Sequence, residues 1–147
     1  MLANRSIPQC RVIPQLVYTD VQEAAAWLCA AFGFTMRLGI GDHRAQLNVG
    51  DGAIVVMEPQ EGDSPDAVRQ RLRAGRILHS VMVRVEDANR HHDQAREHGA
   101  RILRPPVDYP YGERQYSAED FAGHVWTFSQ SIADVDPRQW GGVPGQL

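Results

Sequence analysis

Carboxylates and a histidine gather near the end of the chain, in the stretch AEDFAGHVWTF at residues 118–128. Asp120 and His124 are residue types that coordinate divalent metals through oxygen and nitrogen. An acidic residue and a glycine placed before an apolar run are also typical of a turn that leads into a strand. The stretch therefore supports two hypotheses, a metal site and a structural corner.

Other histidines lie close together in the sequence, and the strongest group is His91, His92 and His98. They fall on one predicted helix, but no two of them have the four-residue spacing with which a helix presents two imidazoles to one zinc ion. The chain also has no G-x-S-x-G nucleophile elbow and no glycine-rich phosphate loop. We interpret these histidines as solvated or partly packed helix residues.

The first half of the chain predicts a strand, a helix and three further strands. A β-branched and aromatic run at 12–20 is typical of a strand. Asp20 is a favourable N-cap for the following helix, and Gly33 fits its C-terminal end. The apolar residues of this helix recur at helical spacing. Three short strands follow, over 34–40, 43–49 and 53–58.

The second half repeats this order. Residues 78–87 predict a strand, Asp87 caps the next helix, and Gly99 ends it. Shorter strands are predicted within 100–103, 114–118 and 124–130. Asp87 follows Asp20 by 67 residues and Gly99 follows Gly33 by 66. A repeat of this kind predicts an α+β fold of two βαβββ modules that pack together, because each alone has too small a core.

The predicted elements divide the chain into four segments. The two modules are expected at 11–58 and 77–130, joined by a linker with a short helix at 59–76 and followed by a tail at 131–147. The tail has no periodicity, so we expect either a frayed end or an arm that lies on a partner, with Trp140 as its anchor.

Composition bounds the class of protein. The chain has 147 residues, 43% of them hydrophobic and 22% charged, with a net charge of −3, as is ordinary for a globular protein. Its basic residues are scattered, which argues against nucleic-acid binding. It lacks both the apolar core of a signal peptide and the run of about 18 apolar residues that a membrane span needs. With Cys10 and Cys29 far apart, we expect a cytoplasmic protein with no membrane partner.

The repeated βαβββ order and three stretches resemble the vicinal oxygen chelate superfamily. The stretches are YTDVQEAAAWLCAAFGF, HSVMVRVEDANRHHDQAREHGARI and YGERQYSAEDFAGHVWTF. This superfamily includes glyoxalase I, extradiol dioxygenases, fosfomycin-resistance proteins and bleomycin-resistance proteins. The resemblance, over about residues 11–130, implies two cupped mixed sheets with helices on their outer faces, ligands inside the cups, and a homodimer.

Metal-dependent members of that superfamily take ligands from the first strand of each half and from the last strand. The corresponding positions here are Ile13, Ser80 and Thr127. Strand alternation predicts that His79, next to Ser80, faces away from the cup, because a one-residue slip would place Arg84 under the helix. Neither an aliphatic side chain nor a threonine replaces the expected ligand, so we expect no metal and no cofactor.

Alternation and the resemblance together predict the residues that contact a small-molecule ligand. Most of these residues are expected to face the cups. Glu58 is expected to do so together with Ile54 and Val56. Two tyrosines are expected on a proline-rich loop at the rim. The set comprises Gln15, Val17, Gln46, Asn48, Glu58, Arg84, Tyr109, Tyr111, Tyr116 and Thr127. Trp126 and Phe128 are predicted to belong to the core. Neutral amides, a guanidinium and apolar walls suit a ligand with hydrogen-bonding groups and an aromatic or anionic part.

Two functions remain open at this point. The first is a metal-free binding protein that resembles bleomycin-resistance proteins and sequesters or carries an aromatic or antibiotic-like ligand. The alternative is a metal-dependent enzyme of glyoxalase or dioxygenase type, with displaced ligands from His79, Glu58 or a partner subunit. A weaker possibility is isomerase or lyase chemistry without metal, with Glu58 as general base.

Overall fold

A computed structural model describes residues 2–59, 66, 70 and 79–145 of the chain. The chain forms two compact units, Met1–Leu78 and His79–Leu147, and each is described separately. The expected linker helix at 59–76 falls almost entirely outside the described residues. In the described part of the chain, no helix is long and apolar enough to cross a membrane.

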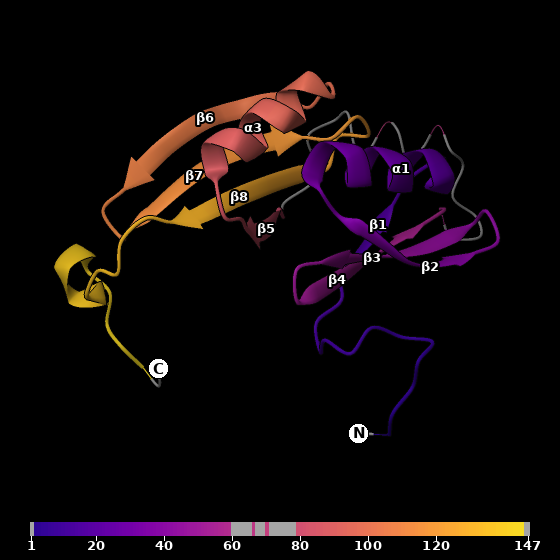
Figure 1. Cartoon of the computed structure of the whole chain (residues 1–147), viewed down its shortest axis with the longest axis horizontal. Helices are drawn as coiled ribbons and strands as arrows, with labels where there is room; N and C mark the ends of the chain where they lie inside the picture. The colour runs from indigo at the N-terminus through magenta and orange to yellow at the C-terminus, as the bar shows by residue number, and fades with distance from the viewer. Residues whose placement is uncertain (1, 60–65, 67–69, 71–78, 146–147) are drawn as a thin grey trace. The chain divides into compact units, whose positions relative to one another are not determined.

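The first unit is a four-stranded mixed sheet with one helix on one of its faces (Figure 1). Its elements are β1 (Gln15–Val17), α1 (Val21–Phe32), β2 (Thr35–Ile40), β3 (Arg44–Val49) and β4 (Gly52–Met57). The strand order is β1-β4-β3-β2, with β1 parallel to β4 and the other pairs antiparallel. This is the predicted βαβββ order.

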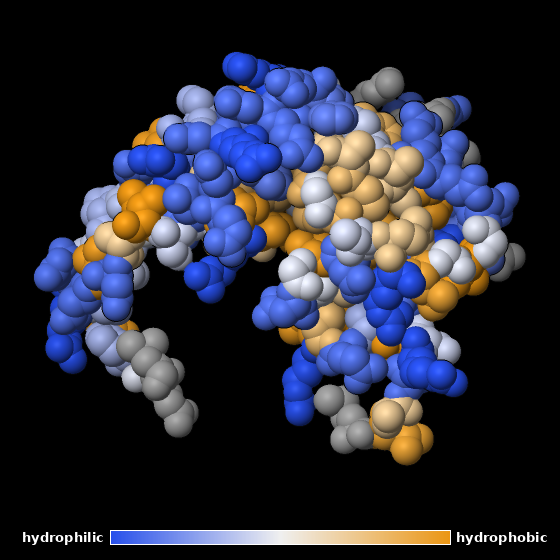
Figure 2. All heavy atoms as spheres, viewed as in Figure 1, coloured by the Kyte–Doolittle hydropathy of each residue, from blue (hydrophilic) through white to orange (hydrophobic). Residues whose placement is uncertain are grey.

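Helix α1 begins and ends where its capping residues predict. The side chain of Asp20 accepts a hydrogen bond from the backbone N–H of Glu23 at 3.0 Å, and Gly33 adopts a left-handed conformation with φ of 78°. The predicted apolar stripe is buried, as Val21, Ala24, Ala25, Leu28, Ala31 and Phe32. Figure 2 shows that the surface over α1 is also pale orange, where Ala26 and Ala30 are exposed. Burial of the stripe fixes α1 on the sheet.

The second unit repeats the plan. Its elements are β5 (Val81–Arg84), α3 (Ala88–Glu97), β6 (Arg101–Tyr109), β7 (Glu113–Glu119), β8 (Val125–Ser131) and the 3-10 helix η1 (Pro137–Trp140). The strand order is β5-β8-β7-β6, with β5 parallel to β8. The chain thus has the predicted α+β fold of two βαβββ repeats, each a mixed sheet with a helix on one face.

The core of the second unit lies between α3 and its sheet. Asp87 caps α3 by accepting the backbone N–H of Arg90 at 3.0 Å, as predicted. Trp126 and Phe128 are fully buried on the face beneath this helix, which confirms their assignment to the core. Their rings lie nearly parallel, with centroids 6.4 Å apart.

Strand β6 is longer than the sequence predicts, because it continues through Pro105 and Pro106. Proline cannot donate a ladder hydrogen bond, but β6 is an edge strand, where a missing donor is tolerated. The register of β6 against β7 shifts between Arg104 and Val107, which accommodates both prolines.

The tail folds back on the turn between β6 and β7. The carbonyl of Gly112 accepts the backbone N–H groups of Ile132 at 2.8 Å and Ala133 at 3.3 Å. Gly112 has a φ of 81°, and a Cβ there would lie 2.2 Å from the carbonyl oxygen of Ala133, so only glycine fits. The tail is therefore attached to its own unit, an arrangement that its lack of periodicity did not predict.

Candidate ligand-binding site

Asp120 organises a corner between β7 and β8. One carboxylate oxygen accepts the backbone N–H groups of Ala122 and His124 at 3.0 Å, and the other accepts the indole N–H of Trp126 at 3.1 Å. Asp120 is 4% exposed, so these bonds form away from water. Both oxygens serve the turn, and the structural-corner hypothesis accounts for this stretch.

The positions at which the superfamily implies metal ligands do not fit a metal. Ile13 precedes β1 and is half-buried, whereas Ser80 precedes β5 and is exposed. Thr127 lies in β8 with its hydroxyl 3.5 Å from that of Ser117. An aliphatic group and two hydroxyls form a poor donor set for zinc or iron. Within residues 2–59, 66, 70 and 79–145, no three His, Cys, Asp or Glu side chains form a group that could hold a metal.

The second sheet has a mostly polar face opposite to α3, which we call the open face. Its side chains alternate with the buried Trp126 and Phe128, and the register of neighbouring strands places them side by side. They include Met82, Arg84, Arg104, Val107, Tyr109, Glu113, Gln115, Ser117, Thr127 and Ser129. Arg84 and Thr127, two predicted ligand contacts, therefore share one face.

Hydrogen bonds order the polar groups of the open face. The carboxylate of Glu113 accepts bonds from the Ser129 hydroxyl and from the Gln115 amide, the latter at 3.2 Å. Arg84 is exposed and donates to the hydroxyl of Ser131 at 3.2 Å. A shallow hollow beside this contact is lined by Ser131, Ile132, Ala133 and Asp134. Among the described residues, Ser131 is the hydrogen-bond partner of Arg84, which thus presents a cation with further N–H donors next to a concave surface.

Three aromatic rings cluster at one end of the open face. Tyr109 and Tyr111 are stacked, with centroids 5.2 Å apart and an interplanar angle of 13°. Trp140 from η1 meets Tyr111 edge-on at 5.4 Å. Arg104 donates to the Tyr109 hydroxyl at 2.8 Å. Both tyrosines were predicted on a rim loop, but Tyr109 is the last residue of β6. Sequence reasoning missed Arg104, whose place on this face depends on the register shift in β6.

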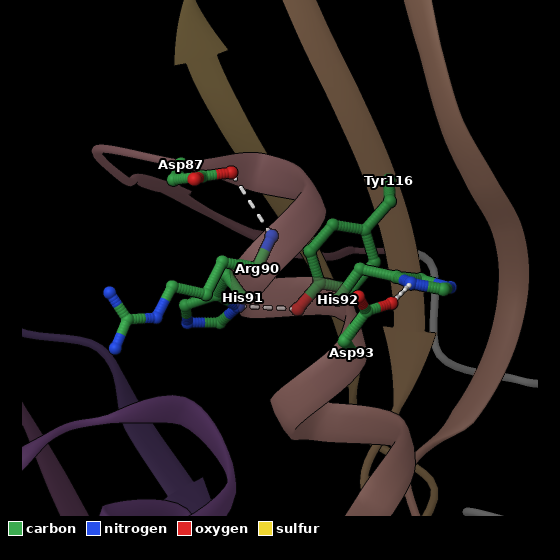
Figure 3. A network of polar contacts seen from close by, with 6 residues as sticks. All are labelled: Asp87, Arg90, His91, His92, Asp93 and Tyr116. Atoms are coloured by element: carbon green, nitrogen blue, oxygen red, sulfur yellow. Dashed lines mark hydrogen bonds and ion pairs between the residues drawn. The ribbon is translucent and has the colours of Figure 1, made fainter.

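Tyr116 does not face the open side, and the prediction for this residue is wrong. It is fully buried beneath α3, where its hydroxyl forms a hydrogen bond with Nδ1 of His91 (Figure 3). Burial raises the pKa of its phenol well above the ordinary value. The cause is the register, because Thr127 pairs with Ser117 and leaves Tyr116 paired with Phe128 on the helix face.

His91 and His92 are partly packed helix residues, which is one of the two interpretations that their spacing allowed. The His91 ring lies 4.2 Å from the Phe128 ring, and the His92 ring lies 5.3 Å from Tyr116. Nδ1 of His92 also contacts the carboxylate of Asp93 at 2.9 Å (Figure 3). These imidazoles cover the aromatic core of the second unit.

The expected orientation of Glu58 with Ile54 and Val56 is also wrong. Ile54 and Val56 are 2% and 0% exposed and share their face with the buried Leu47, beneath α1. Glu58 is exposed past the end of β4, and its backbone N–H donates to the carbonyl of His43 at 3.2 Å. The strand is apolar on both faces, so alternation could not tell which face the helix covers.

The other predicted residues of the first unit share the face opposite to α1. They are Gln15, Val17, Gln46 and Asn48, which the register places on the same side of the sheet. Gln46 is only 5% exposed, because the segment before β1 lies across it. The amide of Gln46 donates to the carbonyl of Ser6 at 2.9 Å and accepts from Arg37. Sequence reasoning missed Arg37 and this segment, which carries no periodic pattern.

The family follows from a match over most of the chain. The family model described as Glyoxalase/Bleomycin resistance protein/Dioxygenase superfamily matches residues 7–128. The chain belongs to this superfamily. The crystal structure of TioX from Micromonospora sp. ML1 is 30% identical and covers 86% of this chain and 100% of that one, with a TM-score of 0.66. No similar protein was found among curated sequences.

More distant members share the fold. The fosfomycin resistance protein FosX from Listeria monocytogenes is 12% identical, with a TM-score of 0.61 over 84% of this chain and 95% of that chain. A glyoxalase/bleomycin resistance protein from Streptomyces sp. CB03234 is 19% identical, with a TM-score of 0.61 over 80% and 97%. Superfamily membership explains the repeated βαβββ plan, while a fold shared by many proteins does not fix what the site of one of them binds.

Proposed function

We propose that this superfamily member binds a small planar aromatic ligand on the open face of the second sheet, without a metal and without converting the ligand. The observation that carries the proposal is the stacked pair Tyr109 and Tyr111 at the edge of that face. In this proposal the protein sequesters or carries its ligand, as bleomycin-resistance proteins do.

The stacked tyrosines support the aromatic part of the ligand. A planar ring system extends an existing offset stack with little loss of side-chain entropy, because the two rings already hold their orientation. Arg104 and Trp140 contact the pair from two directions and restrict its motion. Both contacts favour a preformed stacking surface.

Arg84 supports an anionic or carbonyl-bearing part of the ligand. Tyr109 and Arg84 lie on the opposite edge strands β6 and β5, three strand spacings or about 14 Å apart across the sheet. Between them lie the amide of Gln115, the hydroxyls of Ser129 and Ser131, and the carboxylate of Glu113. A ligand with two or three fused rings and one anionic arm matches this spacing.

Thr127 supports binding without metal chemistry. It occupies the position at which metal-dependent members carry a carboxylate, and its hydroxyl lies beside that of Ser117. A neutral hydroxyl pair can orient a ligand by hydrogen bonds but does not hold a divalent cation. Glu58 is exposed at the end of a strand of the first unit, and no contact in the described residues favours it as a general base.

An antibiotic-like compound is the ligand class that we propose, and a homodimer is the proposed assembly. Similar folds carry the names fosfomycin resistance protein and glyoxalase/bleomycin resistance protein, which supports the class without identifying the compound. Light scattering of the purified chain tests the dimer independently of ligand binding.

A thermal-shift experiment in EDTA tests the proposed function. Phenazine-1-carboxylate and 2-naphthoate are expected to raise the melting temperature, because they bind the folded state alone. Cyclohexanecarboxylate carries the same charge without an aromatic ring and should have no effect at equal concentration. Equal shifts with all three compounds, or shifts that require added metal, would contradict the proposal.

A further inference from the structure

The segment before β1 is held against the first sheet through its backbone. Figure 1 shows this segment on the side of the sheet opposite to α1. Arg37 of β2 donates to the carbonyl oxygens of Arg5 and Ile7, each at 3.0 Å. Gln46 of β3 donates to the carbonyl oxygen of Ser6 at 2.9 Å. Two side chains therefore bind three consecutive carbonyls.

Arg37 and Gln46 form one preformed unit. Arg37 also donates to the side-chain oxygen of Gln46, which leaves the amide nitrogen of Gln46 directed at the segment. Both residues lie on neighbouring strands of one sheet and are bonded to each other, so their positions are set by the fold. We call this pair the carbonyl clamp.

The bound segment is a turn and not an extended strand. The backbone N–H of Ser6 donates to the side chain of Asn4 at 2.9 Å, and the side chain of Gln9 donates to the carbonyl of Asn4 at 3.2 Å. Pro8 is buried next to the clamped residues. The turn directs successive carbonyls to the same side, which is the arrangement that the carbonyl clamp recognises.

The contacts of the clamp go to backbone oxygens, which every peptide possesses. We propose that Arg37 and Gln46 form a binding site for a turn of a peptide or peptide-like ligand, and that residues 4–10 occupy this site as an intramolecular competitor. A ligand with three neighbouring carbonyls on one side displaces the segment. This site is independent of the proposed function, which concerns the second sheet.

Trypsin cleavage of the full chain at the Arg5–Ser6 bond reports occupancy of the clamp. Arg37 binds the carbonyl of this bond, so the bond is protected while the segment is docked. Arg37→Ala removes two charged hydrogen bonds to the segment, so trypsin should cleave this variant at Arg5–Ser6 about tenfold faster or more than the wild type. Mass spectrometry measures both rates. Arg44→Ala is the matched control, because Arg44 lies on the same face and its side chain has no hydrogen bond within the described residues.

A competing peptide tests recognition in the unmodified full chain. The peptide has the sequence of residues 2–10 with Arg5→Gln and Cys10→Ser, which removes its own cleavage site. It should accelerate cleavage at Arg5 of the wild-type chain in a saturable manner. A peptide with Ile7→Ala should act equally well, and one whose Ser6 carbonyl is reduced to a methylene should lose the effect.

Three results would overturn the proposal. The first is an equal cleavage rate in the wild type and in Arg37→Ala, with both chains folded by circular dichroism. The second is a wild-type rate that no peptide changes, a measurement that does not depend on whether the variant folds. The third is a wild-type rate that falls as the chain concentration rises, since the segment would then dock on a second copy.

Discussion

The carboxylate of Asp120 accepts a hydrogen bond from the indole nitrogen of Trp126 at 3.1 Å, with both residues buried. The same carboxylate accepts two backbone N–H groups of the turn that separates them. One side chain therefore fixes the turn and satisfies the only polar atom of the Trp126 side chain. The position of β8, and of Thr127 within it, depends on this corner.

Asp120→Ala should lower the free energy of unfolding by about 3 kcal/mol, because it leaves a buried indole N–H and two turn amides without their acceptor. Urea denaturation measures the change. Asp93→Ala is the control, since Asp93 is an exposed carboxylate of the same unit and should cost about 0.5 kcal/mol or less. Equal effects of the two variants would contradict the role of Asp120.

Tyr116→Phe should lower the free energy of unfolding by about 1 kcal/mol at neutral pH, because it removes the buried hydroxyl that is hydrogen-bonded to His91. The cost should shrink as the pH rises above 10.0, the ordinary pKa of tyrosine. Burial raises the pKa of Tyr116 in the folded state, so above that pH the unfolded chain releases this proton and the folded chain keeps it. The stability of the wild type should therefore fall more steeply than that of the variant.

Urea midpoints of both chains between pH 8 and pH 11 give this comparison. A second observable is the absorbance of tyrosinate. It should show that one tyrosine of the wild type ionises only when the chain unfolds. A stability difference that stays constant over this range would contradict the effect of burial on Tyr116.

Trp140→Ala should weaken binding of phenazine-1-carboxylate about fivefold to tenfold, because Tyr111 loses its edge contact and the stacked pair becomes less ordered. Phe121→Ala is matched in exposure, at 46% against 44%, and lies at the opposite end of β7. Fluorescence titration of each variant gives the affinities. A loss that is equal in both variants would assign the effect to stability and not to the aromatic cluster.

Metal ions should leave the melting temperature unchanged. Zn²⁺ or Mn²⁺ added at a slight molar excess, or EDTA treatment of the purified chain, should shift it by about 1 °C or less, since a folded-state ligand set is needed for metal stabilisation. A saturable increase with one metal, reversed by EDTA, would contradict the reading of Ile13 and Thr127.

The fold was predictable because its signals are local. Asp20 and Asp87 each precede a helical run in the sequence, and each caps the predicted helix. The repeat of the two caps implies two equivalent modules. Strand β6 is longer than predicted, because an edge strand tolerates Pro105 and Pro106. The edge position is a property of the assembled sheet and cannot be read from the local sequence.

The candidate site was predictable only in part, because it depends on register. Alternation along β5 and β8 placed Arg84 and Thr127 on a common face, but the side of Tyr116 required the pairing of β7 with β8. The docking of the segment at residues 4–10 depends on single hydrogen bonds between distant positions. Such contacts leave no periodic signal in a sequence.

A titration of the full chain with phenazine-1-carboxylate in EDTA, followed by ¹H–¹⁵N correlation spectra, tests the central proposal most directly. Saturable shifts should appear at the amides of Tyr109 and Thr127 and at the indole of Trp140, and the compound should be recovered unchanged by mass spectrometry. Absence of saturable shifts on the second sheet, a requirement for metal, or chemical conversion of the compound would contradict the proposed function.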